Sequence, residues 1–119
     1  MLKEIRGMEY TLEVLRSLHN NPGRHDSVEI YNLVQESSRV GNVSKSYVQK
    51  MLPRMVKAGL LESNETGYGL AKPIDEITVD RVLNICDMPE PDSPMYSICD
   101  GLKQGVSLTT IDEFYDFTE

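Results

Sequence analysis

The stretch "SKSYVQKMLPRMVKAGLLESNETGYGLAKP", residues 44–73, decides the fold. Its first half predicts a helix that Ser44 caps and Gly59 ends, because serine satisfies free amides at a helix start and glycine accepts the left-handed end position. Its second half predicts a short hairpin with "NETG" at the tip, where Gly67 supplies a positive backbone angle. The buried face of the helix is expected to hold Tyr47, Val48, Met51, Leu52, Met55 and Val56, which recur three and four positions apart.

The opposite side of this predicted helix is basic. Lys50, Arg54 and Lys57 follow the same helical spacing, so one face packs and the other meets solvent. Pro53 also lies inside the helix, where it removes one backbone hydrogen bond and clashes with the carbonyl of Gln49. We therefore expect a kink or a frayed turn at this position.

Two helices are predicted to precede this stretch. The first begins near Met8 and is stopped by the Asn-Asn-Pro-Gly run at residues 20–23. Its buried face is expected to hold Met8, Leu12, Leu15 and Leu18, and its other sides Glu9, Glu13 and Arg16. The second runs from Ser27 to Glu36, where Asp26 and Glu29 form a reciprocal capping pair. Its buried stripe consists of Ile30, Leu33 and Val34.

A fourth helix, "VDRVLNIC", is predicted after Thr78, which caps it. Its inner side is expected to hold Val79, Val82, Leu83 and Cys86. The Pro-rich acidic segment "DMPEPDSP" then favours a linker, "MYSICDGLK" a short helix, and Thr110 with Glu113 a capped turn.

The predicted fold is mostly α with a small β-hairpin: a winged helix-turn-helix with additional C-terminal helices. We divide the chain into a winged helix-turn-helix domain at residues 1–86, a linker at 87–94 and a C-terminal helical tail at 95–119. The tail is the candidate dimerisation element, because its apolar and aromatic content exceeds what a solvated tail needs. These residues are Met95, Tyr96, Ile98, Leu102, Ile111, Phe114, Tyr115 and Phe117. The alternative is that they fold back over their own fourth helix.

The charge of the chain is unevenly distributed. The formal net charge is -7, yet residues 39–57 contain five cations and no acidic residue. The remainder therefore carries -7 minus +5, which is -12. A phosphate-facing patch on an acidic body has this pattern, and a solvated basic helix face is the alternative.

The candidate DNA-binding residues lie on the predicted third helix and its flanks. Ser44, Lys45, Ser46, Gln49 and Lys50 occupy the exposed N-terminal side, where serine and glutamine can read base edges and lysine can meet guanine or phosphate. Tyr47 lies between the two faces, as a core anchor or a phosphate contact. The full set is Arg39, Ser44, Lys45, Ser46, Tyr47, Gln49, Lys50, Arg54, Lys57, Asn64 and Thr66. The tip of the wing contains the acidic Glu65 and no lysine or arginine, which disfavours a minor-groove contact.

Catalytic and metal-binding chemistry have little support, so we expect neither an enzyme nor a cofactor. His19 and His25 have no cysteine or acid spacing typical of a metal site and are interpreted as solvated. Cys86 and Cys99 are expected to stay reduced in a cytoplasmic protein, since the N-terminus lacks a secretory signal. No segment is apolar over the length that a membrane span requires.

Several segments together resemble the Rrf-two regulators, which include the iron-sulfur cluster regulator, the nitric-oxide-sensing repressor and the cysteine-metabolism repressor. They are Ser44, Tyr47, "KAGLLES" at 57–63, Gly67-Tyr68, "LAKP" at 70–73 and "EITVDRVL" at 76–83. The resemblance covers roughly residues 8–86. It implies a winged-helix transcription regulator, usually a homodimer, with residues 44–50 beginning the recognition helix and residues 64–68 forming the wing.

The sequence departs from that family in its cysteines, in its wing and in its dimerisation helix, which is shortened to "MYSICDGLK" and accompanied by a longer loop before Ser44. Cluster-binding members use three closely spaced cysteines after the fourth helix, whereas this chain has only Cys99 there, so we expect no iron-sulfur cluster. The wing also lacks the family's arginine. The leading hypothesis is a DNA-binding transcription regulator that acts as a homodimer on double-stranded DNA. The alternative is a winged-helix module that binds a protein partner through its acidic surfaces.

Overall fold

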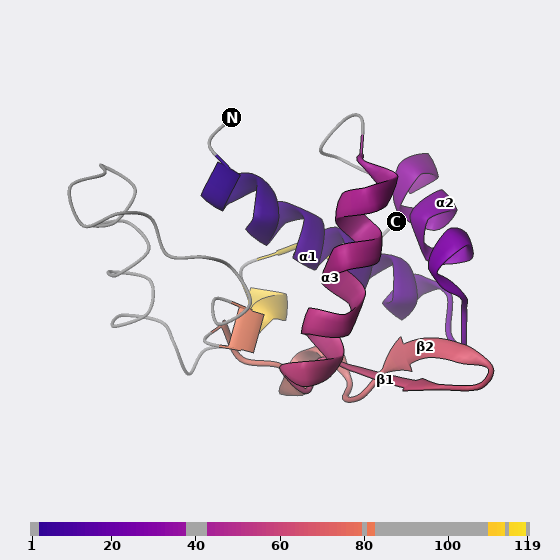
Figure 1. The fold of residues 1–119 in the computed structure, drawn as a ribbon. Helices are drawn as coiled ribbons and strands as arrows, with labels where there is room; N and C mark the ends of the chain where they lie inside the picture. The colour runs from indigo at the N-terminus through magenta and orange to yellow at the C-terminus, as the bar shows by residue number, and fades with distance from the viewer. Residues whose placement is uncertain (1–2, 38–42, 80, 83–109, 114, 119) are drawn as a thin grey trace.

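The computed structural model describes residues 3–37, 43–79, 81–82, 110–113 and 115–118. Three helices are followed by a two-stranded antiparallel hairpin and two short 3-10 turns (Figure 1). The elements are α1 (Lys3–Asn20), α2 (Ser27–Ser37), α3 (Lys45–Lys57), β1 (Leu61–Asn64), β2 (Gly67–Leu70), η1 (Ile74–Glu76) and η2 (Ile111–Glu113). This order and arrangement confirm the predicted winged helix-turn-helix plan.

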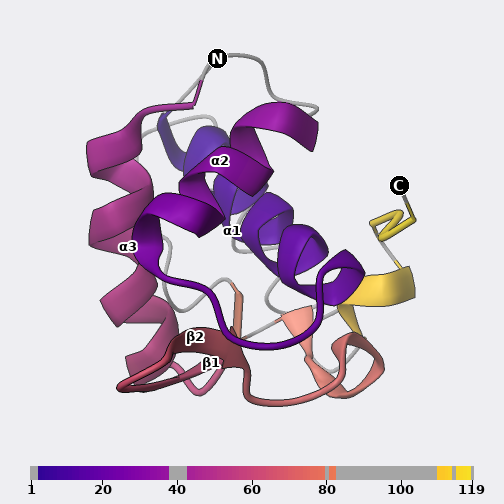
Figure 2. The same cartoon turned by 90° about the vertical axis from the view of Figure 1, so that its right-hand side faces the viewer.

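The three helices pack on one another pairwise around a single core. The two views show α1 and α3 crossing, α2 beside them, and the hairpin next to the C-terminal end of α3 (Figures 1 and 2). Apolar side chains at helical spacing line these contacts, as expected from the periodicity. The fully buried ones include Val14, Leu15, Ile30, Val34, Val48, Leu52, Met55 and Leu60.

At the start of α2, one of the two predicted capping hydrogen bonds is present, the one to Asp26. The Glu29 amide donates to Asp26 Oδ1 at 2.8 Å, as the pattern indicated. The reciprocal half is wrong, because the Glu29 carboxylate turns instead to His25, with Oε2 at 3.2 Å from Nδ1.

Helix α3 runs without interruption from Lys45 to Lys57, so the frayed turn expected at Pro53 is not there. Ser44 caps it, its hydroxyl accepting from the Tyr47 amide at 3.3 Å. Gly59 has φ +81° and ends the helix as predicted. A β-carbon at Gly59 would also lie 2.9 Å from Arg81 Nη1, which donates to the Ala58 carbonyl.

The hairpin is in the predicted place, and the turn before α2 is joined to it by one isolated bridge. Its register pairs Leu61 with Leu70 and Asn64 with Gly67. Gly67 has the predicted positive φ, at +122°. His25, in the turn before α2, and Tyr68, in β2, exchange two backbone hydrogen bonds of 3.0 and 2.8 Å. These bonds attach the turn to the wing. His25 is therefore half-buried and held in place, and the expectation of a solvated residue was wrong for it.

The polar side expected for the first helix is partly wrong as well. Glu13 is fully buried and Arg16 is 3% exposed, and they form a two-pronged ion pair with N–O distances of 3.0 and 2.9 Å. The hydrogen bond to Glu13 holds the pKa of Arg16 above its ordinary value, although burial alone would lower that pKa. The C-terminal segment covers this face, so its charges cannot reach solvent.

Residues 110–113 and 115–118, which we call the strap, lie between the end of the wing domain and α1. Thr78 and Thr110 form a bridge, and the Ile111 amide donates to the Ile77 carbonyl at 2.9 Å. Val79 and Val82 are buried beneath, as predicted. In place of the predicted capped turn the structure has the short 3-10 turn η2. The Thr110 hydroxyl donates to the Asp112 carboxylate and does not form the expected cap with Glu113.

Hydrogen bonds and a buried ring fasten the strap to α1. The Tyr115 hydroxyl donates to Glu13, Arg16 Nη1 donates to the Thr118 carbonyl at 3.2 Å, and Asn20 donates to the Phe117 carbonyl at 3.0 Å. The Phe117 side chain is itself buried. Ile111 and Phe117 thus lie in the chain's own core. The alternative of folding back is met in part, because Phe117 and its neighbours fold onto α1 and not onto the predicted fourth helix. Other expectations fall outside the described residues: Arg39, Leu83, Cys86, the linker 87–94 and the tail residues from 95 to 109.

Candidate nucleic-acid interface

One face of α3 packs and the other is open to solvent. The packed face consists of Val48, Met51, Leu52 and Met55, all buried. The open face holds most of the candidate residues: Ser44, Lys45, Ser46, Gln49, Lys50, Arg54 and Lys57 are exposed. The structure therefore brings seven of the predicted residues together on one surface, which we call the α3 face.

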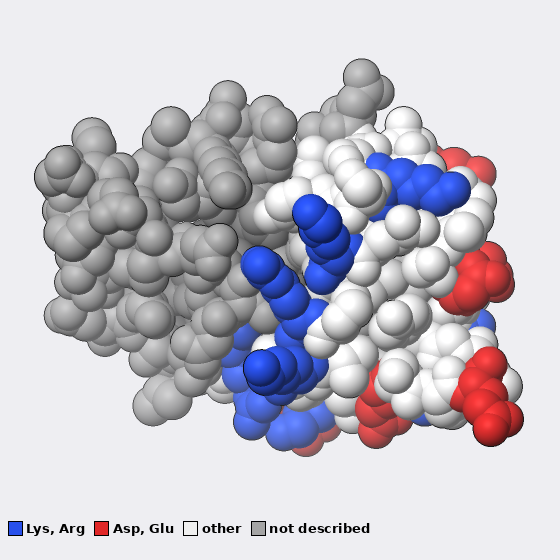
Figure 3. All heavy atoms as spheres, in the orientation of Figure 1, with Lys and Arg blue, Asp and Glu red and all other residues white. Residues whose placement is uncertain are grey.

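The α3 face is positively charged. α3 carries four cations and no acidic residue, and none of these cations forms an ion pair within the part of the chain that is described. Figure 3 shows Lys and Arg side chains gathered over α3, with Asp and Glu mainly toward the right and lower edges of the view. Unpaired exposed cations of this kind attract an anion without first having to break an internal contact.

The N-terminal end of α3 favours an anion for a second reason. Its first turn has no acidic residue, and free amides at a helix start carry partial positive charge. Ser44 uses its hydroxyl as the cap, and this oxygen lies 3.1 Å from the hydroxyl of Ser46. Ser44 therefore holds the end of the helix in shape, and Ser46 presents a hydroxyl beside it.

Tyr47 lies on the side of α3 that packs against the core. It is half-buried, and its ring meets that of Tyr10 edge to face, with centroids 5.1 Å apart. Aromatic pairs prefer this geometry. The contact supports the core-anchor alternative for Tyr47 and sets it apart from the exposed residues of the α3 face.

The tip of the wing is closed by its own side chains. Asn64 Oδ1 accepts from both the amide and the hydroxyl of Thr66, at 2.8 and 2.7 Å. Both residues are exposed, as is Glu65 between them. This turn fixes the shape of the tip while leaving the Asn64 amide nitrogen open to a ligand.

Two arginines beside the interface were missed by reasoning from sequence. Arg81 reaches the C-terminal end of α3, and Arg24 reaches β1 from the turn before α2. Neither is close in sequence to the element that it contacts. The signal for Arg24 was the pair of glycines in β2, since a glycine inside a strand often marks the close approach of another group.

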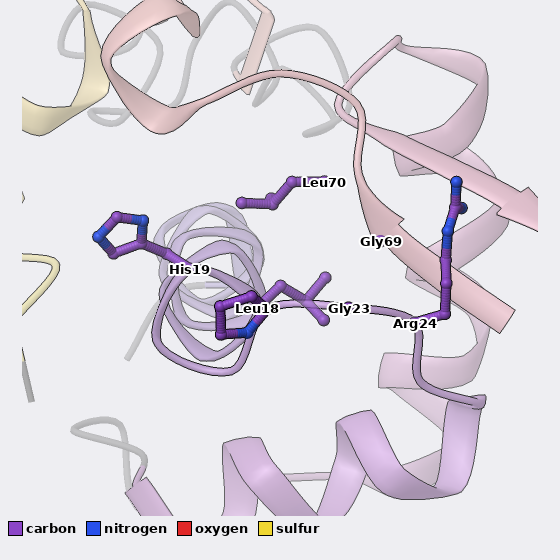
Figure 4. Close-up of a pocket in the computed structure, with 7 residues that line it drawn as sticks. Leu18, His19, Gly23, Arg24, Gly69 and Leu70 are labelled. Atoms are coloured by element: carbon purple, nitrogen blue, oxygen red, sulfur yellow. The ribbon is translucent and has the colours of Figure 1, made fainter.

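An open pocket of about 360 Å³ lies between the end of α1, the turn before α2, and β2 (Figure 4). Leu18, Pro22 and Leu70 give it apolar walls, and His19 and Arg24 are at its edges. None of its lining residues comes from α3. It is therefore a feature of the base of the wing and separate from the α3 face.

Comparison with known proteins finds one matching family model and several solved structures of similar fold. A family model described as Rrf2, iron-dependent transcriptional regulator, matches residues 6–108. The fold is similar to CymR (YrzC), the global cysteine regulator of B. subtilis, at a TM-score of 0.65 and 22% identity over the whole of both chains. Staphylococcus aureus CymR is similar over 99% of both chains, at a TM-score of 0.59 and 19% identity. No curated protein matches significantly.

The residues described do not fit the iron that this family description implies. No three His, Cys, Asp or Glu side chains among them lie together in a way that could hold a metal ion. Both ring nitrogens of His25 are engaged, by Asn21 and Glu29. The chain has two cysteines, fewer than a three-cysteine site needs, and both lie outside the described residues. Among the helices described, none is long and apolar enough to cross a membrane.

Proposed function

We propose, since the chain belongs to the Rrf2 family of transcriptional regulators, that it binds double-stranded DNA through the α3 face, with α3 in the major groove. The family match supports the general role of a regulator. The exposed residues of the α3 face support the proposed mode of binding. We expect no enzymatic activity and no step that depends on a cofactor.

The single observation behind this mode is the set of exposed, unpaired cations on α3. Lys45 and Lys57 are twelve residues apart, a span of about 18 Å along the helix axis. Phosphate groups that border a groove are spread over a comparable distance, so several can be met at once. The body of the protein carries the opposite charge, and this leaves α3 as the favoured side for approach.

The candidate residues divide into two roles on this surface. Ser46, Gln49 and Lys50 lie toward the N-terminal half and are assigned to base edges, because the serine and glutamine side chains can donate and accept there and the lysine can donate. Lys45, Arg54, Lys57 and Arg39 are assigned to phosphates. Asn64 and Thr66 are assigned to the backbone near the wing, and Ser44 and Tyr47 to holding α3 in place.

We further propose that the protein acts as a cytoplasmic homodimer. One small unit offers few phosphate contacts, whereas two recognition helices about one DNA turn apart double them and favour a near-palindromic site. The interface is assigned to segments after Pro73, without Ile111 and Phe117, which are buried in their own chain.

A salt-titrated binding assay with a random-sequence duplex tests the proposal. We expect measurable affinity at low salt that falls steeply as salt rises. Absence of binding even at low salt would overturn the proposal and favour the alternative, a module that binds a protein partner through acidic surfaces.

A further inference from the structure

The wing has no cation of its own that faces a nucleic acid. Glu62 and Glu65 are exposed on β1 and at the tip, and no Lys or Arg lies within residues 61–70. An acidic wing repels the phosphate backbone that it would approach beside α3. The structure nevertheless brings a cation to the hairpin from elsewhere, because Arg24 extends from the turn before α2 (Figure 4).

Arg24 lies on the face of the hairpin that carries Asn64. The register pairs Glu62 with Gly69 and Asn64 with Gly67, and side chains two apart in a strand share a face. A β-carbon at Gly69 would lie 3.2 Å from Arg24 Cδ on this same face. The glycines of β2 leave the surface bare there, and the stem of Arg24 covers it.

The position of Arg24 is fixed by its neighbour. His25 exchanges two backbone hydrogen bonds with Tyr68 of β2, and its ring nitrogens lie 2.9 Å from the Asn21 carbonyl oxygen and 3.2 Å from Glu29. The turn is therefore fixed to the wing. A guanidinium placed in this way loses little further freedom when it binds a ligand.

The present partner of Arg24 is a weak one. Nη1 donates to the Glu62 carbonyl oxygen and Nη2 to Glu62 Oε2, both at 3.0 Å. The side chains are 31% and 56% exposed, so water screens the pair and it contributes little to stability. The guanidinium keeps further N–H donors, and its planar fork can donate to two oxygens of one phosphate.

We propose that Arg24 is the residue through which the wing binds the DNA phosphate backbone, and that Glu62 restrains it in the free protein. This inference rests on the proposed function, since it places the wing beside the same duplex as the α3 face. It gives the acidic wing a cation that its own strands do not provide.

Binding of a labelled random-sequence duplex by the full chain, titrated with salt, tests the inference. Arg24→Gln is expected to lower affinity and reduce the slope of log K against log salt by about one unit. Glu62→Gln is expected to raise affinity at low salt by removing the competing carboxylate. Lys72→Gln removes the same charge from an exposed residue beyond the hairpin and serves as the control, with a smaller effect on the slope.

The conservative variant separates charge from structure. Arg24→Lys keeps the cation but not the two-point geometry, and we expect it to retain the wild-type slope with reduced affinity. If Arg24→Lys loses the slope as Arg24→Gln does, or if Arg24→Gln matches Lys72→Gln, the inference is overturned. The Lys50→Ala/Arg54→Ala variant tells this failure from that of the proposed function: a reduced slope there with no effect at Arg24 leaves the α3 face standing.

Discussion

Gly67 meets two constraints at the tip of the wing, one of conformation and one of space. Its φ of +122° strains any residue with a β-carbon, and such a carbon would lie 2.5 Å from the His25 carbonyl oxygen. The close approach is what allows His25 and Tyr68 to exchange their backbone hydrogen bonds. One residue without a side chain thus joins the wing to the turn before α2.

Replacing Gly67 with alanine is expected to destabilise the fold by more than backbone strain, which alone costs about 1–3 kcal/mol. Gly23 is a matched control, because it has φ +103° but open space where a β-carbon would go. Urea unfolding of both alanine variants measures the difference. Equal losses for Gly23→Ala and Gly67→Ala would show that the contact with His25 does not contribute.

Gln49 is the residue best suited to reading a base, since it is exposed on α3 and has both a donor and an acceptor. Gln49→Ala is expected to relax discrimination at one base pair, by about 1–3 kcal/mol, with little change in binding to random duplex. Selection of binding sites from a random pool, with wild type and variant, measures this. A variant that selects the same sequence with the same preference would exclude Gln49 from base readout.

At the scale of elements, the strap makes the C-terminal end part of the winged-helix core. It contributes Ile111 and Phe117 to that core and covers the ion pair of Glu13 and Arg16. A buried pair is stable only when its remaining hydrogen-bonding groups are satisfied. Tyr115 and Thr118 supply partners for it.

Tyr115→Phe is expected to lower the free energy of unfolding by about 1–3 kcal/mol, because it removes a hydroxyl that donates to the buried Glu13 carboxylate. Tyr31→Phe, at a half-buried position in α2, is the control for losing a tyrosine hydroxyl. Chemical denaturation of both variants gives the comparison. A loss at Tyr115 no larger than that at Tyr31 would mean that the strap does not satisfy the pair.

Local patterns were enough to predict α2, α3, the hairpin and the residues of the α3 face. The end of α1 was also predicted, whereas its start is at Lys3 and not near Met8. Ser44 caps α3, Gly59 ends it and Gly67 turns the hairpin, and spacing alone indicates these local roles. The close approach of His25 to Gly67 is not local and could not be predicted in this way. The buried state of Glu13 and Arg16 could not be predicted in this way, because the residues that cover them are 102 positions away. Arg24 was missed for the same reason, as its partner lies on another element.

For the whole molecule, the proposed mode of DNA binding depends on the separation of charge. Residues 39–57 are basic and the remainder is acidic, so a duplex is attracted to one side and repelled elsewhere. A second copy of the chain would double the attractive surface. The number of subunits therefore bears directly on affinity.

Light scattering of the full chain at micromolar concentration is expected to give the mass of a dimer. Leu102→Asp should shift it toward the monomer, since a buried charge at an apolar interface is costly. A point substitution is preferred to truncation, because removing the strap would also uncover the ion pair on α1. A monomeric wild-type chain would contradict the dimer, and an unchanged mass for Leu102→Asp would place its interface elsewhere.

The salt dependence of duplex binding by wild type and by Lys50→Ala/Arg54→Ala tests the central claim, that the α3 face binds DNA, most directly. Both side chains are exposed on α3 and form no ion pair among the described residues, so their removal leaves the fold intact. We predict weaker binding and a shallower slope of log K against log salt, by up to about one unit for each phosphate that the variant no longer neutralises, with Lys72→Ala close to wild type. An unchanged affinity and slope in the double variant would contradict the claim.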